Sequence, residues 1–575
     1  MLLETAMIPS YQRRAGVLLP AFTPRRDGDL GIGDTRALRE WVDWAAEHRV
    51  GFLQLLPIQE TGDDDSPYNA ISSVALEPAY LSCEPDDLPG VTVVEVAAAR
   101  AGLGAAAAGR WVDYRAVRGA KNRLLETAWR RFPQAPAGLH AEFDAFCRAE
   151  FDWLVDYSRF RWLMERNGGR ETWDLWPEDS NEPERALETL AQERALDPAR
   201  FDDRIGFFKW VQWLCFRQWR ALRAYAGEKG VKLMGDIPIG VSWYSADVFF
   251  NRREFDLDWC GGAPPERMFK HDRFIRKWGQ NWGIPLYRWE LMKQNDFQWW
   301  RQRVGKLVEI FHVFRIDHVL GFYRIYAFPW RPQQNAEFLD LTEKEAAAKT
   351  GGRLPGWAWR ADDTPEHRAA NRADGDLRLK VILEAAQGGE VVGEDLGCVP
   401  EYVRPHLASL GIAGFRIPHW DADEDGHVIP PEELPECSFA TYATHDHDTL
   451  MAMWCDLVHE TEDLMAEPDD REKAANYLRL LCEFAGLLGK NGKWPPGSPE
   501  LRWRLVDRLF ASNSRLAAVM VTDVFGMTER FNRPGTVGGN NWRLRLPWTV
   551  GEIRANPELA GECERLARSI AAGDR

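Results

Sequence analysis

Residues 313–318 read VFRIDH, a short apolar run that ends in charged and polar side chains. Seven other short runs end in a similar way, and helical patterns lie between them. Apolar runs that alternate with helices are typical of parallel strands buried on both faces. A (β/α)8 barrel has eight strands, so the sequence predicts an α/β fold of the TIM-barrel type. The eight runs are residues 16–22, 51–58, 231–238, 313–318, 390–396, 413–420, 438–446 and 517–524.

Two helical patterns support this interpretation. In residues 34–48 apolar side chains recur at the i, i+3, i+4, i+7 spacing of an amphipathic helix, and Asp34 or Thr35 can serve as its N-cap. Residues 296–311 show a similar stripe, with Asp296 as the expected N-cap. Both helices are expected to cover the outside of the barrel.

The predicted strands are unevenly spaced, which indicates large and mostly helical insertions on the loops that follow them. We expect a single catalytic barrel over residues 1–575, with a helical subdomain at 63–204 after the second strand. Smaller insertions are expected at 239–290 after the third strand, including a lid, and at 320–388 after the fourth. Loops at this end of a barrel border the active site, so the insertions are expected to shape a substrate groove.

Composition narrows the functional classes. The net charge of −16 argues against nucleic acid as a partner, because phosphate binding needs a basic surface. No apolar run is long enough to cross a membrane, and the amino terminus lacks the pattern of a signal peptide. The nine cysteines include no C-x-x-C pair, so we expect a cytoplasmic protein without a zinc cage or disulfide framework. The 27 tryptophans belong mostly to the core, but their number favours a carbohydrate-binding protein.

Three acidic residues stand at or just past the ends of three predicted strands: Asp317, Glu394 and Asp446. In a barrel these ends converge on one face. Glycosidic bond cleavage needs a carboxylate that attacks the anomeric carbon and a carboxylic acid that protonates the leaving oxygen. Each acid could instead cap the helix after its strand, but that explanation is weak for all three together.

The motifs around these acids resemble those of the amylomaltases, glycoside hydrolase family 77 of the α-amylase clan. The resemblance covers most of the chain and implies a 4-α-glucanotransferase acting on maltooligosaccharides and α-1,4-glucans, with no cofactor and no metal. The matching segments are RIDH (315–318), GEDLG (393–397), THDHD (444–448), GVLLPAFTPRRDGDLGIGD (16–34), SPYNAISSVALEPAYL (66–81), GDIPIG (235–240), GQNWGIPLYRWE (279–290) and FNRPGTVGGNNWRLRLP (531–547).

The resemblance implies a role for each acid. Asp317 matches the nucleophile, Glu394 the general acid/base, and Asp446 the carboxylate that binds sugar hydroxyls and supports the transition state. Arg315, on the same strand face as Asp317, is expected to hold the nucleophile ionised. Glu394 must be protonated near neutral pH, and like charge from its neighbour Asp395 is expected to help raise its pKa.

The remaining expected contacts all face the substrate. Histidines are expected to hydrogen-bond hydroxyls of the sugar being cleaved, an aromatic ring to stack on it, and the lid to fold over the bound glucan. The residues grouped as substrate-binding are Tyr68, Asp236, Gln280, Trp282, Arg315, His318, Asp395 and His445.

Some alternatives stay open. The basic stretch at 270–277 is either a solvated loop face or a mobile lid flanked by glycines. Histidine and aspartate alternate at 445–448, which is compatible with a metal-binding site, but these residues depart from the H-x-H-x-D-H pattern of binuclear hydrolases. An α-glucan hydrolase shares the first half-reaction with a transferase, and a non-catalytic glucan-binding protein would keep the groove alone.

Overall fold

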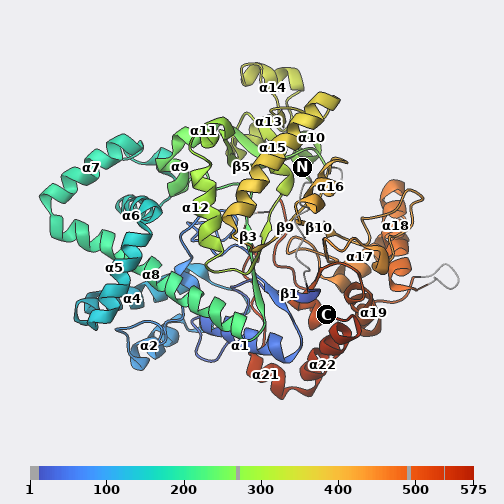
Figure 1. Cartoon of the computed structure of the whole chain (residues 1–575), viewed down its shortest axis with the longest axis horizontal. Helices are drawn as coiled ribbons and strands as arrows, with labels where there is room; N and C mark the ends of the chain where they lie inside the picture. Colours follow the sequence, from blue (N-terminus) through green and yellow to red (C-terminus); the bar gives the residue numbers. More distant parts are fainter. Residues whose placement is uncertain (1–11, 267–271, 488–493, 537) are drawn as a thin grey trace, which may run out of the picture.

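The computed structural model describes residues 12–266, 272–487, 494–536 and 538–575. Eight parallel strands close into a barrel at the centre of the molecule (Figure 1). Each strand lies beside its neighbours in chain order, and the last strand pairs with the first. The barrel strands are β1 (Arg14–Leu18), β2 (Phe52–Gln54), β3 (Lys232–Ile237), β6 (Val313–Ile316), β9 (Glu390–Gly393), β10 (Ala413–Arg416), β11 (Ser438–Ala440) and β12 (Leu516–Met520).

Each of the eight apolar runs overlaps one of these strands, so the predicted TIM barrel is confirmed. The strands end earlier than the runs do. After β12, for example, the chain turns at once into the short helix α20 (Val521–Val524), which the sequence analysis had included in the strand.

The period of two along β6 sorts its side chains between the inside and the outside of the barrel. Val313 packs in the apolar cluster of the barrel interior, whereas Phe314 and Ile316 belong to the cluster between the strands and the surrounding helices. Arg315 shares the inner face with Val313, and its guanidinium carbon lies 5.8 Å from the Phe415 ring centroid. A buried cation therefore stands on top of an apolar core.

Helix α1 (Thr35–Glu47) confirms the first helical pattern, and the Asp34 carboxylate caps it by accepting from a backbone N–H. The second pattern forms α12 (Gln298–Leu307), but Asp296 is not its N-cap. Asp296 and Phe297 both have positive φ values, so the helix begins one residue later, after Phe297.

The segment between β2 and β3 is helical and forms the left side of Figure 1. Its last helix spans 31 residues and packs on α1 and β3, returning the chain to the barrel. The helices are α2 (Val93–Leu103), α3 (Ala105–Ala108), α4 (Tyr114–Arg131), α5 (Ala137–Ala149), α6 (Phe151–Arg166), α7 (Pro183–Leu196) and α8 (Pro198–Glu228).

The segments after β3 and β6 jointly build a four-stranded antiparallel sheet that the sequence analysis did not predict. Each segment contributes two adjacent strands, and in the order β5-β4-β7-β8 the two pairs are joined through β4 and β7. The strands are β4 (Phe255–Ala263), β5 (Gln280–Tyr287), β7 (Ile325–Phe328) and β8 (Gly356–Ala358). Helices of the same segments surround it: α9 (Ala246–Phe250), α10 (Arg273–Trp278), α11 (Trp289–Gln294), α13 (Asn335–Phe338), α14 (Glu343–Lys349) and α15 (Pro365–Ala385).

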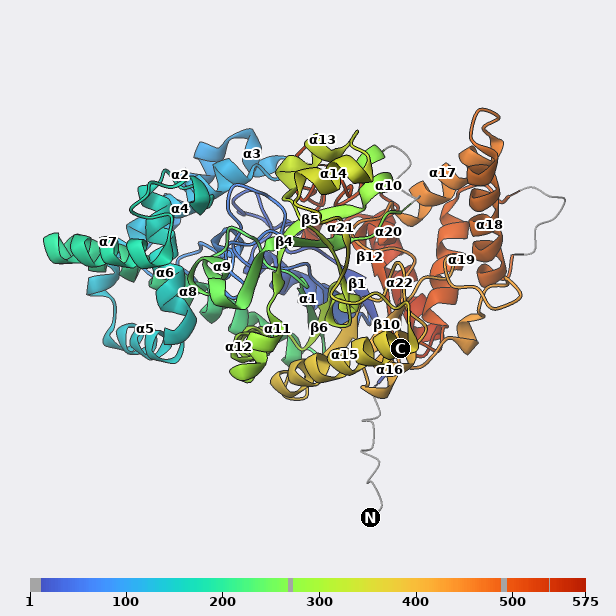
Figure 2. The same cartoon turned by 90° about the horizontal axis from the view of Figure 1, so that it is seen from above.

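The remaining helices follow the last four strands. Two of them, α17 and α18, form a pair that projects from one end of the molecule (Figure 2). Within the described ranges no helix is both long and apolar enough to cross a membrane. These helices are α16 (Val403–Ser409), α17 (Leu450–Glu462), α18 (Pro468–Ala485), α19 (Pro499–Phe510), α21 (Val550–Ala555) and α22 (Pro557–Ala572).

Candidate active site

Four ionisable side chains meet where three adjacent barrel strands end. Asp236 lies near the end of β3 and is the register partner of Arg315 on β6. Asp317 and Glu394 come directly after β6 and β9, whose last residues are themselves paired. Carboxyl ends of barrel strands are where catalytic groups of this fold are found.

Arg315 is the centre of this group. One of its terminal nitrogens, Nη1, lies 2.6 Å from Asp236 Oδ2. The other, Nη2, lies 2.7 Å from Asp317 Oδ1 and 3.9 Å from Glu394 Oε2. Both contacts share one nitrogen, so the oxygens of Asp317 and Glu394 are no further apart than the sum of these two distances. That limit lies at the bottom of the range of about 6.5–9.5 Å seen in inverting glycosidases.

Glu394 is held by backbone groups on both oxygens. Oε2 accepts from the His318 N–H at 2.7 Å and Oε1 from the Leu396 N–H at 3.1 Å. Burial raises the pKa of Glu394 to about 8; Asp317 adds to the rise, while Arg315 and the His318 N–H oppose it. A carboxyl group with this pKa is protonated at neutral pH and can act as a general acid.

Tyr68 extends this group through its contact with Asp236. The Tyr68 hydroxyl donates to Asp236 Oδ2 at 2.7 Å, and its ring stacks on His445 with centroids 5.2 Å apart. Burial raises the pKa of Asp236 to about 7, against the opposing effect of Arg315. Among the described residues nothing hydrogen-bonds its buried Oδ1, which leaves an acceptor for a ligand hydroxyl. Trp542 packs against both rings, 5.7 Å from Tyr68 and 5.6 Å from His445.

Asp446 faces this group from the loop after β11. Its Oδ1 lies 3.4 Å from His445 Nε2 and accepts from the Asn532 amide at 2.6 Å. Although burial opposes the effect, His445 and the Asn532 hydrogen bond lower the pKa of Asp446, so the group is an anion. The Arg530 guanidinium donates to the backbone oxygen of Asp446 and to Asp448, at 2.7 Å for the latter, and so fixes the loop.

Trp282 brings the antiparallel sheet to the site. It lies on β5, and its ring meets the His318 ring edge to face at 4.8 Å. Its indole N–H donates to Gln280 at 3.4 Å, and its side chain is 37% exposed. Burial lowers the pKa of His318 to about 4, so this imidazole is neutral and can both donate and accept a hydrogen bond.

The structure thus gathers most of the predicted site residues and adds three. Arg530, Asn532 and Trp542 were not assigned a role from the sequence, although two of them fall in the recognised segment 531–547. The sequence of that segment indicated the family, but it did not indicate which contacts its side chains make.

Comparison with known proteins shows which family the chain belongs to. The family model described as 4-alpha-glucanotransferase, glycoside hydrolase family 77, matches residues 19–550. The chain belongs to this family. A 4-alpha-glucanotransferase of Chlamydia caviae is 30% identical over 544 residues, covering 94% of this chain and 91% of that protein. One from Thermus thermophilus is 29% identical over 575 residues, with 97% and 98% covered.

Solved structures show the same fold. An amylomaltase from Streptococcus agalactiae, solved in complex with acarbose, superposes with a TM-score of 0.71 at 23% identity. The match covers 98% of this chain and 100% of that one. Family membership makes the chain a glucan-transferring enzyme of the 4-alpha-glucanotransferase type, and the family acts on α-1,4-glucans.

Asp395 corrects one expectation for this enzyme. Its side chain is fully buried, and both of its oxygens accept from protein donors. Its oxygens accept from the Phe415 N–H at 2.5 Å and from Arg404 at 3.0 Å. The charge of Asp395 contributes to the raised pKa of Glu394, after burial and Asp317, as the sequence analysis expected.

The basic stretch at 270–277 is described only in part, since Lys270 lies outside the described residues. Its described remainder forms most of α10, and the side chains of Arg273, Arg276 and Lys277 are exposed to solvent. Lys277 donates to the backbone oxygens of Leu339 and Leu341 at 3.0 and 2.5 Å, and Arg273 pairs with Asp340 at 2.7 Å.

In the structure His447, one of the candidate metal ligands, contacts other protein groups. His447 Nδ1 lies 2.8 Å from the Thr444 hydroxyl, and its ring meets the Trp420 ring at 5.1 Å. Within the part of the chain that the structure describes, no three His, Cys, Asp or Glu side chains are grouped to hold a metal ion.

Proposed function

We propose that the enzyme transfers α-1,4-glucan segments by a retaining double displacement, with Asp317 as nucleophile and Glu394 as general acid/base. The observation that carries this proposal is the shared contact of both carboxylates with Arg315 Nη2. Retaining enzymes hold their two carboxyl groups about 5–5.5 Å apart, and the geometry around Arg315 allows this separation.

In the first step an oxygen of Asp317 attacks the anomeric carbon while the bond to the glycosidic oxygen breaks. Glu394 gives its proton to that oxygen, so the leaving glucan departs as a neutral alcohol. The product is a covalent glucosyl ester on Asp317. In the second step the 4-hydroxyl of an acceptor glucan attacks the same carbon, Asp317 leaves, and Glu394 recovers a proton from the acceptor.

The surrounding groups suit a neutral sugar. We assign Asp446, His318 and His445 to hydroxyls of the sugar at the cleavage point, and Tyr68 with Asp236 to the same ring. The partner-free Asp236 Oδ1 and the neutral His318 support this assignment. Trp282 and Gln280 on β5 would cover the acceptor and keep water from the ester.

We place this reaction in the cytoplasm and assign it no cofactor. All nine cysteines are free thiols, as expected in a reducing compartment. The oxygen, nitrogen and aromatic groups named above are sufficient for retaining chemistry.

The test is a product ladder from maltotriose. A transferase yields glucose together with oligomers longer than the donor, whereas a hydrolase yields glucose and maltose only. Asp317→Asn should abolish both transfer and hydrolysis, because an amide does not attack the anomeric carbon as a carboxylate does. Glu394→Gln should stop transfer from maltotriose but spare glucosyl fluoride, whose leaving group needs little protonation.

Asp448→Asn is the matched control for Asp317→Asn. It also removes one carboxylate, but that carboxylate contacts Arg530 and stands outside the group around Arg315. It should therefore lose far less activity. Near wild-type transfer by Asp317→Asn would show that another group is the nucleophile.

A further inference from the structure

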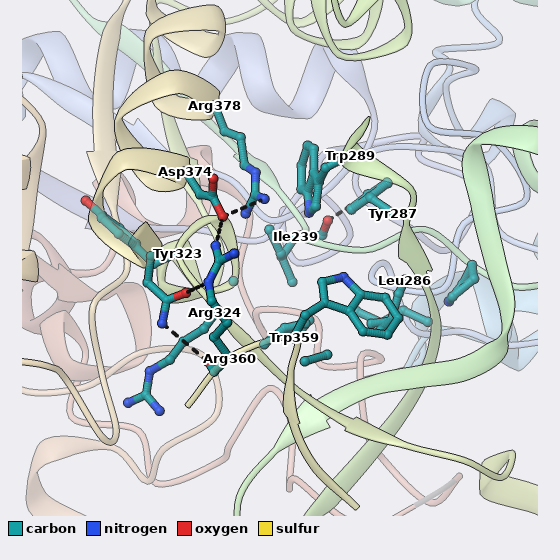
Figure 3. Close-up of a pocket in the computed structure, with 16 residues that line it drawn as sticks. Ile239, Leu286, Tyr287, Trp289, Tyr323, Arg324, Trp359, Arg360, Asp374 and Arg378 are labelled. Atoms are coloured by element: carbon teal, nitrogen blue, oxygen red, sulfur yellow. Dashed lines mark hydrogen bonds and ion pairs between the residues drawn. The ribbon is translucent and has the colours of Figure 1, made fainter. Parts of the chain in front are cut away.

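A pocket whose lining includes none of the three carboxylates lies between the antiparallel sheet and α15 (Figure 3). We call it the sheet pocket. Leu286 on β5 and Ile325 on β7 form its apolar side, and Trp359 follows β8 at its mouth. Arg360, Asn371 and Asp374 form its polar side.

The exposure of Trp359 is the feature of this pocket that packing does not explain. Its side chain is 60% exposed, and Trp282 in the active site is the other strongly exposed tryptophan of the described residues. The neighbouring Trp357 is instead covered by the Arg324 guanidinium, 3.6 Å from its ring centroid. Trp259 on β4 meets Trp359 edge to face, with centroids 6.5 Å apart. The Trp359 ring is thus supported at its edge and left open to solvent.

The polar side of the pocket is held in place by its own contacts. Arg360 donates to Asn371 Oδ1 at 3.1 Å and pairs with Asp374, which also lies 3.5 Å from Arg378. Asn371 donates in turn to Asp362 at 2.9 Å. Within the described chain these contacts use Nε and Nη2 of Arg360, which leaves its Nη1 for a ligand.

This arrangement selects a class of ligand. An anion would have to compete with the carboxylates that already pair with the arginines, Asp374 with Arg360 and Asp362 with Arg324 at 2.6 Å. A neutral polyol does not compete, because its hydroxyls can accept from the guanidinium and donate to the carboxylate. Its C–H face can stack on the open indole, as in the carbohydrate contacts expected of aromatic side chains.

We infer that Trp359, at the mouth of the sheet pocket, binds a glucosyl unit of a long α-1,4-glucan, with the sugar ring on the open face of the indole and its hydroxyls toward Arg360 and Asp374. This rests on the proposed function for the choice of polyol. The pocket and the active site share the turn after β6: Gly321 lines the pocket, and a side chain there would meet His318. A glucan held at the mouth of the sheet pocket is therefore kept near the active site.

Retention of this kind acts through effective concentration. Two weak sites on one chain bind it more tightly than either alone, provided that the substrate is long enough to reach both. Trp359→Ala should therefore raise KM for long-chain amylose about three- to tenfold. The kcat/KM for maltotriose, which is too short to use both positions, should change by less than about twofold. Trp359→Phe should restore part of the KM, because it keeps an aromatic face.

Phe151→Ala is the matched control, since it also removes an exposed aromatic ring, 63% exposed, but at the start of α6 and outside the pocket. It should leave both kinetic constants at wild-type values. Equal changes for amylose and maltotriose in Trp359→Ala would assign Trp359 to the cleft itself, and no change for either would remove the pocket from substrate binding. Both results overturn the inference.

A binding measurement separates this inference from the proposed mechanism. Calorimetric titration of Asp317→Asn and of Asp317→Asn/Trp359→Ala with β-cyclodextrin needs no turnover. Loss of one class of site in the double variant supports the pocket even if Asp317 is not the nucleophile. Identical isotherms overturn the inference even if the transfer chemistry is as proposed.

Discussion

Replacement of Glu394 by glutamine should change how the stability of the enzyme depends on pH. In the folded protein burial raises the pKa of Glu394 from the ordinary value of 4.5 to about 8. Between these two values the folded state keeps a proton that the unfolded chain releases. Unfolding therefore becomes more favourable as pH rises from about 4.5 to about 8, and the loss levels off above that.

The size of this loss follows from the two pKa values. At about 1.4 kcal/mol per pH unit, the whole rise in the pKa of Glu394 corresponds to on the order of 5 kcal/mol of unfolding free energy. Glutamine carries no proton to lose, so Glu394→Gln abolishes this contribution. The unfolding free energy of the variant minus that of the wild type should grow by on the order of 4 kcal/mol between about pH 5 and about pH 9.

The slope is a better readout than the absolute difference. Both oxygens of Glu394 accept hydrogen bonds from backbone N–H groups. The amide nitrogen of glutamine does not accept, so Glu394→Gln loses one of these hydrogen bonds at every pH. Asp236, whose burial raises its pKa to about 7, adds a pH dependence that is present in both proteins and cancels in the difference. Urea unfolding followed by tryptophan fluorescence at several pH values supplies the measurement. A difference that does not vary with pH would refute the buried, protonated state of Glu394.

Four further results follow from the same site. The kcat/KM for maltotriose should fall as pH rises through about 8, because Glu394 then loses the proton that it must donate; a profile flat to pH 10 would contradict this. Asn532→Ala removes a hydrogen bond to the Asp446 anion worth about 1.5–3 kcal/mol, so steady-state kinetics should show kcat/KM about 10- to 100-fold lower. Trp282→Ala should raise the ratio of released reducing ends to transferred segments, since it uncovers the ester to water; an unchanged ratio would exclude the lid. Exhaustive chelation should leave transfer intact, and activity restored by added zinc or calcium would revive the metal alternative.

The barrel could be predicted from the sequence because its strands are buried on both faces and appear as short apolar runs. The antiparallel sheet could not. Its strands have no uniform apolar pattern, and β4 carries register shifts against β5. Its central pair, β4 and β7, joins two insertions that are separated in the chain by the barrel strand β6. No local pattern records such a pairing.

The error at Asp395 has a local cause that the sequence did contain. Neighbouring residues at the end of a strand point to opposite faces. Glu394 turns toward Arg315, so Asp395 must turn away, toward Arg404 and the β10 backbone. Adjacency to a catalytic acid was read as membership of the site, whereas the period of two indicates a residue behind it.

Other parts of the site depend on closure of the barrel and could not be derived from any one segment. Trp542 and Asn532 follow β12, the last strand, yet Trp542 packs on Tyr68, which follows β2. These segments become neighbours because β12 pairs with β1, and β1 with β2. Arg543 strengthens the junction by binding Asp65 at 2.9 Å through its Nε. The Tyr68 ring that stacks on His445 is therefore in place only when the first and last strands have paired.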